Sequence, residues 1–230
     1  MPRLERKHSL PTRLFHWANV PILAGMIWSG LLIYWANDVY AIRFRGQVLI
    51  KFFPTWFYDK FDMASRLADG MAWHFALMWL FALNGLLYVL YTTISGEWRH
   101  LIPNRQTPRE AVQVVMHDLY LDRRPLPRRK FNGAQRLAYS GVIAMGAGSL
   151  LTGLAIYKPV QLGWLSWALG GYQAARLEHF SLTILYGVFF VVHITQVVKA
   201  GWNNARSMII GVELTADGEP SYDDAELAAR

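Results

Sequence analysis

The chain has 230 residues, of which 53% are hydrophobic, a net charge of +7 and no cysteine. The absence of cysteine excludes disulfides, thiolate-bound iron–sulfur clusters and covalently attached haem. A charge of +7 in a soluble protein would suggest nucleic acid, but here the basic residues flank long apolar runs. This arrangement favours a membrane protein that contacts lipid and binds no nucleic acid.

Four uncharged runs are long enough to cross a bilayer, which takes about 20 apolar residues. The predicted spans are residues 14–34, 71–94, 137–157 and 179–198. They define one membrane domain, residues 1–211, followed by an acidic segment, residues 212–230, that is predicted to be disordered. No internal repeat is evident in the sequence.

The connections between these runs differ in character. The first, residues 35–70, is predicted to be a mixed loop. The second, residues 95–136, is strongly basic. Within it, Thr107-Pro-Arg-Glu110 has the form of a capping box and precedes an amphipathic stretch, which predicts a helix lying at the membrane surface. Residues 160–175 are apolar but too short to span, so an interfacial segment is expected there.

The Lys and Arg residues are distributed unevenly between the segments expected on the two sides of the membrane. The N-terminal segment, the second connection and the C-terminal segment together carry sixteen of them, whereas the first and third connections carry seven. By the positive-inside rule, both termini are predicted to be cytoplasmic.

Two histidines of the last run, His179 and His193, are fourteen residues apart. On a helix this spacing places them on nearly one face, with a rise of about 21 Å. With the predicted orientation, His16 lies near the inner start of the first span and His74 near the outer start of the second. Depth therefore pairs His16 with His193 and His74 with His179.

Pairs of opposed imidazoles suit six-coordinate haem iron, whereas structural zinc usually takes four protein ligands at one site. The sequence thus predicts an all-α membrane protein, a four-helix transmembrane bundle that encloses two haem b groups. A haem with both axial positions filled carries electrons and has no open position for substrate. The alternative is that each histidine is a hydrogen-bond donor between helices. Three further histidines in polar segments are predicted to be solvated: His8, His100 and His117.

Four more residues are candidates for contacts with the haems. Gly30 and Gly85 lie on the histidine faces of their helices, where a flat macrocycle needs space; ordinary close helix packing is an equal alternative. Arg13 and Arg176 each stand three residues before a predicted ligand. They would bind haem propionates through charge-assisted hydrogen bonds, or else extend to the lipid headgroups.

The chain resembles the four-helix dihaem cytochrome b subunits of membrane-bound formate dehydrogenases, nickel–iron hydrogenases and thiosulfate reductases, which are bacterial cytochrome b561-like proteins. The resemblance covers residues 8–211. It rests on Arg13-Leu-Phe-His16-Trp17, on the spacing of His179 and His193, and on the segments 130–136 and 207–211.

The resemblance implies bis-histidine haems at both levels and a quinone site at the start of the third span, next to the inner ligand His193. The matching residues are Asn132, Gly133 and Gln135, although Ala134 replaces a glycine that the formate dehydrogenase branch has directly before the glutamine. The alternative for Asn132 is a helix N-cap.

The predicted function is electron transfer between a quinone pool and a periplasmic oxidoreductase subunit, in the bacterial cytoplasmic (inner) membrane. The substrate chemistry would reside on that partner, for which the resemblance implies a molybdenum or iron–sulfur type. Two aromatic groups, residues 56–58 and 164–167, are candidate docking surfaces or parts of an interfacial belt. The alternatives are a stand-alone b561-type carrier, and a haem-free anchor or transporter with a histidine proton relay.

Overall fold

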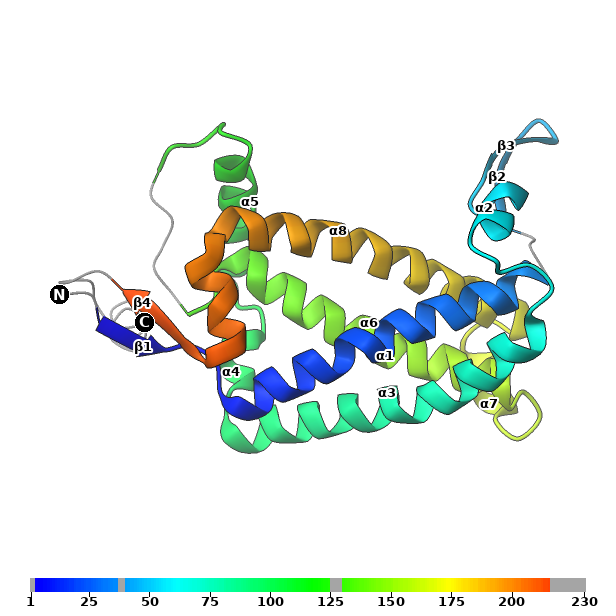
Figure 1. The fold of residues 1–230 in the computed structure, drawn as a ribbon, viewed down its shortest axis with the longest axis horizontal. Helices are drawn as coiled ribbons and strands as arrows, with labels where there is room; N and C mark the ends of the chain where they lie inside the picture. The colour runs from blue at the N-terminus through cyan, green and yellow to red at the C-terminus, as the bar shows by residue number, and fades with distance from the viewer. Residues whose placement is uncertain (1–2, 37–39, 125–129, 216–230) are drawn as a thin grey trace. The chain divides into compact units, whose positions relative to one another are not determined.

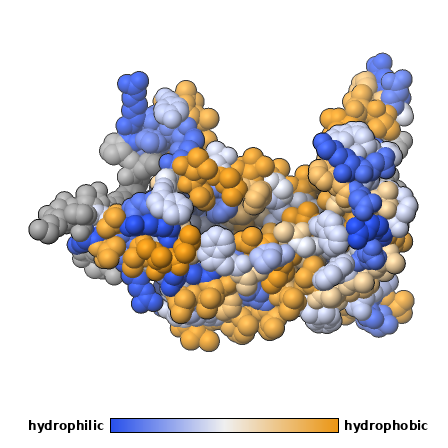
Figure 2. Space-filling view, viewed as in Figure 1, coloured by the Kyte–Doolittle hydropathy of each residue, from blue (hydrophilic) through white to orange (hydrophobic). Residues whose placement is uncertain are grey.

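The computed structural model describes residues 3–36, 40–124 and 130–215. Four long helices dominate it (Figure 1): α1 Leu10–Trp35, α3 Leu67–Ser95, α6 Gly133–Tyr157 and α8 Tyr172–Ile210. Each is long and apolar enough to cross a membrane, yet only 6–11% of its most apolar window is buried within the chain. Hydrophobic residues cover much of the surface in Figure 2. Such helices need lipid as their surroundings, and the prediction of four spans is confirmed.

The helices extend beyond the predicted spans because the helical backbone continues through the polar residues at the ends of the apolar runs. α8 begins seven residues before His179 and runs past Lys199 to Ile210. Within it, Gly201 has φ 78°, a left-handed conformation that interrupts the regular helix and that glycine adopts without strain. α1 contains Pro21, which has no backbone N–H, so the helix lacks one of its regular hydrogen bonds at this position.

The chain divides into two compact units, residues 16–84 and a terminal unit of residues 1–15 with 85–230. In the 16–84 unit the expected loop contains a hairpin and a helix: β2 Ala41–Phe44, β3 Gln47–Lys51 and α2 Thr55–Lys60. The two strands pair antiparallel through Arg45 and Gly46, both with positive φ, as a two-residue hairpin turn requires. Leu32 of α1 packs there with Tyr58 and Met63 in a buried cluster.

In the terminal unit, α6 packs against α8 and against α5, residues Thr107–Asp118. Two short helices complete this unit: α4 Trp98–Leu101 and α7 Gly163–Ala168. The predicted helix between the second and third spans is therefore present as α5, but its predicted capping box is wrong. Gln106 occupies the N-cap without a side-chain bond. The Asn104 carboxamide oxygen instead accepts from the backbone N–H groups of Gln106 and Thr107, both at 3.0 Å.

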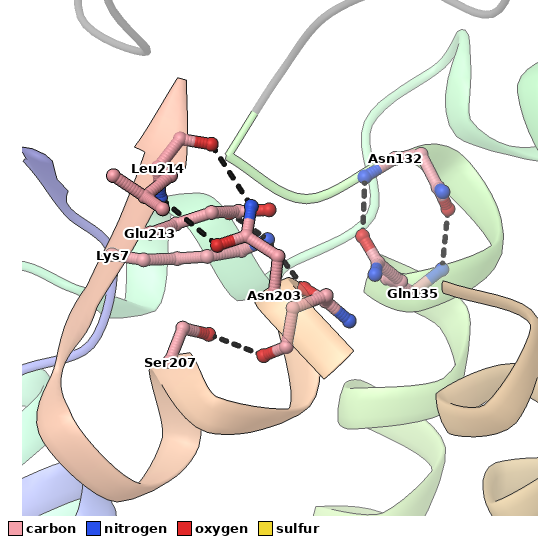
Figure 3. Close-up of polar contacts among 8 residues, drawn as sticks. Lys7, Asn132, Gln135, Asn203, Ser207, Glu213 and Leu214 are labelled. Carbon is pink, nitrogen blue, oxygen red and sulfur yellow. Dashed lines mark hydrogen bonds and ion pairs between the residues drawn. The ribbon is translucent and has the colours of Figure 1, made fainter. Parts of the chain in front are cut away.

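The two ends of the described chain pair with each other. β1 Arg3–Arg6 and β4 Val212–Thr215 form an antiparallel two-stranded sheet. The prediction of disorder is therefore wrong for residues 212–215, and residues 216–230 lie outside the described part. The Lys7 ammonium binds the Glu213 carboxylate at 2.7 Å, and the Asn203 side chain bonds both backbone groups of Leu214 (Figure 3). Pairing of the two ends agrees with an even number of spans.

Candidate functional site

His74 of α3 is held by a serine of α1, within the 16–84 unit. Nδ1 of His74 lies 3.0 Å from Oγ of Ser29, whose residue is fully buried. The adjacent residue Gly30 lies against the imidazole: a methyl group there would be in van der Waals contact with the ring, 3.5 Å from Cε1 of His74. One turn earlier on α3, Gly70 approaches the backbone of α1 so closely that a methyl group would stand 3.1 Å from the Ser29 carbonyl oxygen. The predicted ligand therefore has a fixed position on a tightly packed helix pair.

His179 of α8 has the same surroundings on α6, within the terminal unit. Its Nδ1 lies 2.9 Å from Oγ1 of Thr152, a residue that is 3% exposed. Gly153 follows, and a methyl group there would lie 3.3 Å from Cε1 of His179. The buried Ala155 and Ala175 bring the two helices together at this level.

These two contacts reveal an internal repeat that the sequence analysis missed. Residues 25–30 and 148–153 share the pattern Gly-x-x-x-(Ser/Thr)-Gly, and residues 74–77 and 179–182 share His-Phe-x-Leu. The packing contacts repeat together with this sequence pattern. A methyl group at Gly25 would meet the Leu77 side chain, and one at Gly148 would meet the Leu182 side chain, the third residue after each histidine. The repeat is a few residues long on each helix, which is why only the matching contacts make it visible.

This arrangement fits an axial haem ligand. In both histidines Nδ1 lies beside a neighbouring hydroxyl, so Nε2 is the nitrogen that would bind iron. Ligating histidines commonly bond a second partner through the other ring nitrogen in this way. The glycine beside each ring keeps a bulky side chain away from it. Ser29, Thr152 and Gly153 were not identified from the sequence.

His16 and His193, the predicted inner ligands, are half-buried. The ring of His16 meets Trp17 edge-on with 5.2 Å between centroids, and His193 stacks on Phe189 at 5.6 Å. Each predicted pair takes one histidine from each unit: His16 and His74 belong to the 16–84 unit, and His179 and His193 to the terminal unit. The pairing itself stays a prediction.

The arginines predicted to bind propionates have partners within the chain. The Arg13 guanidinium donates to the Ile209 carbonyl near the C-terminal end of α8, where helical carbonyls lack intrahelical partners. Arg176 lies 3.4 Å from the Gln173 side-chain oxygen and 5.9 Å from the centre of the Tyr172 ring. Gly85 has space beside it: a methyl group there would meet no described heavy atom within 4 Å. Haem contacts of these residues stay predictions.

The residues of the predicted quinone site begin α6. Asn132 is the N-cap and forms a capping box with Gln135 (Figure 3), which realises the alternative role considered for it. Gly133 permits contact with α5: a methyl group there would lie 2.7 Å from the Thr107 carbonyl oxygen and 2.8 Å from the Ala111 nitrogen. Both residues thus have structural roles, whether or not quinone binds beside them.

The prediction that His8 is solvated is wrong. His8 is 9% exposed, and its ring stacks on Phe131, directly before Asn132, with 6.0 Å between centroids. His100 and His117 are half-buried.

α5 connects the start of α6 to the part of α8 that follows His193. The Gln196 amide, three residues after His193, donates to the Asp118 carboxylate at 2.6 Å, and the Lys199 ammonium donates to the Asp118 carbonyl. An open groove of about 850 Å³ runs along α5 and is lined by none of the three predicted quinone residues. At its edge, hydrogen bonds from Arg124 lower the pKa of Asp122 to about 2.

The two aromatic groups proposed for docking differ in exposure. Tyr58 is 2% exposed within the core of its unit and is therefore no docking residue. Trp56, Trp164 and Trp167 are exposed, the last two on the short helix α7.

The comparisons agree with this picture. A model of the family described as prokaryotic cytochrome b561 matches residues 7–211, which include all four long helices. The chain is also 32% identical, over 186 residues, to the "Putative protein-methionine-sulfoxide reductase subunit YedZ1" of Azospira oryzae; the match covers 80% of this chain and 86% of that protein. The chain therefore belongs to the prokaryotic cytochrome b561 family, as a multi-pass bacterial membrane protein that carries electrons and uses haem b.

Proposed function

We propose that the chain holds two haem b groups, one through His16 and His193 and one through His74 and His179, and links a quinone pool to a periplasmic oxidoreductase subunit. The observation that carries this proposal is the matched setting of His74 and His179. Each has Nδ1 beside a buried hydroxyl and a glycine beside the ring.

When bound, a haem with two imidazole ligands supplies one-electron transfer. The chain's part is to fix the ligand rings, to surround them with apolar side chains and to leave no iron position for substrate. The substrate chemistry would then belong to another subunit. The Azospira oryzae relative is named as a subunit of a protein-methionine-sulfoxide reductase, which supports a multi-subunit assembly of this kind. From the family resemblance we propose a partner of molybdenum or iron–sulfur type, with exposed Trp164 and Trp167 as its candidate contact.

For the quinone we propose a position beside the start of α6. The capping box uses the side-chain oxygens of Asn132 and Gln135, so both amide nitrogens are available as donors to a quinone carbonyl. The hydrogen bond between Asp118 and Gln196 supports closeness of α5 to the region of α8 that follows His193. The charge distribution supports both termini, and hence this site, on the cytoplasmic side.

Optical and redox measurements on the purified full chain test the proposal. We expect reduced b-haem absorption, about two haems per chain by a pyridine haemochrome assay, and haem oxidation on adding a quinone analogue. Purification from the native membrane should also recover a second subunit. A chain without b-haem absorption would favour the haem-free alternative. A chain with haem that purifies alone would favour a stand-alone carrier.

A further inference from the structure

Ser29 and Thr152 make the same contacts on two different helices. The Ser29 hydroxyl donates to the Gly25 carbonyl at 2.7 Å, and the Thr152 hydroxyl donates to the Gly148 carbonyl, also at 2.7 Å. In each case the acceptor lies four residues earlier on the same helix. The hydroxyl oxygen then faces a histidine Nδ1, at 3.0 Å for His74 and 2.9 Å for His179.

The number of hydrogens on each hydroxyl determines which nitrogen of each imidazole carries the proton. A hydroxyl has one hydrogen, and the short bond to the preceding turn uses it, so the oxygen can only accept from the histidine. Nδ1 must therefore carry a proton in His74 and in His179. In a neutral imidazole with a proton on Nδ1, Nε2 has the free lone pair.

We propose that Ser29 and Thr152 are positioning residues for one haem, because they fix the ring orientation and the Nδ1–H form of its two ligands, His74 and His179. This inference rests on the proposed function above. It assigns to the hydroxyls of Ser29 and Thr152 an influence on the midpoint potential of the haem. An acceptor at Nδ1–H strengthens the imidazole as a donor to iron, which favours the ferric state and lowers the midpoint potential of the haem.

The test uses Ser29→Ala and Thr152→Ala in the full-length chain, purified with haem and titrated optically as a function of potential. We expect each variant to raise the midpoint potential of the same haem and to leave the other haem unchanged. We also expect the low-field electron paramagnetic resonance signal of that haem to shift, because the ligand ring is free to rotate. The apparent dissociation constant of that haem from the chain should rise by about tenfold or more, as is usual when a hydrogen-bond partner of a ligating histidine is removed.

The chain offers matched controls. Ser29→Thr and Thr152→Ser keep a hydroxyl at each position and should restore the potential and the resonance signal. Thr92→Ala removes a hydroxyl that is equally buried, in α3, and that donates to the Tyr88 and Val89 carbonyls, both at 3.0 Å. This variant should leave both potentials unchanged, although it loses the same kind of bond to the preceding turn.

The outcomes separate this inference from the proposed function. A wild-type chain without b haem overturns the proposed function itself. A wild-type chain with haem, and alanine variants with unchanged potentials and resonance signals, overturns only the inference. Shifts in two different haems would instead contradict the proposed pairing of His74 with His179. If an alanine variant is not recovered folded, infrared redox-difference spectra of the wild type with ¹⁵N-labelled histidine decide. Ring bands of a hydrogen-bonded Nδ1–H support the proposal, and bands of an unbonded Nδ1–H overturn it.

Discussion

Asn132 and Gln135 bond each other reciprocally at the start of α6. The Gln135 backbone N–H donates to the Asn132 side-chain oxygen at 2.9 Å, and the Asn132 backbone N–H donates to the Gln135 side-chain oxygen at 3.0 Å. These bonds use both carboxamide oxygens and neither amide nitrogen. A single residue can thus cap the helix and still donate to a ligand, and variants can separate the two roles.

Asn132→Asp should separate them. Asp is as good an N-cap as Asn and is favoured by the helix dipole, so the free energy of unfolding should change by less than about 0.5 kcal/mol. The amide donor is lost, however, and the KM for a quinone analogue should rise roughly threefold to tenfold, as expected for one hydrogen bond. Asn132→Ala should lose both, with about 1 kcal/mol of stability. An unchanged KM in Asn132→Asp would mean that Asn132 only caps the helix.

Gly133→Ala should weaken the contact between α5 and α6. The added methyl group would lie 2.6 Å from Cβ of Glu110 and 2.7 Å from the Thr107 carbonyl, and backbone atoms cannot move aside cheaply. We expect a loss of about 1–3 kcal/mol, measured as a lower thermal midpoint in detergent. Gly141→Ala, on the same helix with no described heavy atom within 4 Å, is the control. It should be neutral or slightly stabilising, and equal destabilisation by both variants would contradict the packing role of Gly133.

Lys7→Met should destabilise the pairing of the two chain ends. The Lys7 and Glu213 side chains are only 10% and 15% exposed, so removal of one leaves the other charge poorly solvated. We expect a cost of about 2 kcal/mol, less than for a fully buried pair, with faster proteolysis and amide exchange in β4. The double variant Lys7→Met with Glu213→Leu should recover part of this loss. A double variant that loses the sum of both single effects would show that the two side chains are not coupled.

Alanine substitution of the four histidines should produce two spectral classes. His74→Ala and His179→Ala should each delete the same haem, and His16→Ala and His193→Ala should each delete the other. Haem content and the split of the reduced α band in low-temperature spectra would report which haem is lost. Loss of one haem by His74→Ala and of the other by His179→Ala would refute the depth-based pairing.

The spans and their histidines could be predicted from the sequence because lipid imposes simple rules of length and polarity. The helix ends could not. Hydropathy falls at Gln173 and Lys199, but the backbone continues its helical bonds through them, and the regular helix is interrupted only at Gly201. The capping boxes show the same limit. Thr107 to Glu110 and Asn132 to Gln135 have the same spacing, and only the competing Asn104 carboxamide distinguishes them.

The hydroxyl partners of His74 and His179 could not be identified from the sequence, for a physical reason. A serine or threonine in an apolar helix ordinarily satisfies its hydrogen by bonding to the preceding turn, as Thr92 does. Ser29 and Thr152 differ from Thr92 in sequence only by their flanking glycines, which do not by themselves indicate a histidine partner. The difference is the imidazole that a neighbouring helix presents to two of them, and that contact depends on tertiary packing.

The sheet of β1 and β4 joins residues that are about 200 positions apart in the chain. During synthesis β1 leaves the ribosome before α1, and its partner strand emerges after α8. Closing so long a loop is entropically costly, so the strands gain little by meeting early. Their pairing can therefore serve as a marker of finished membrane insertion, and an unpaired β1 would identify chains whose last helix has failed to enter.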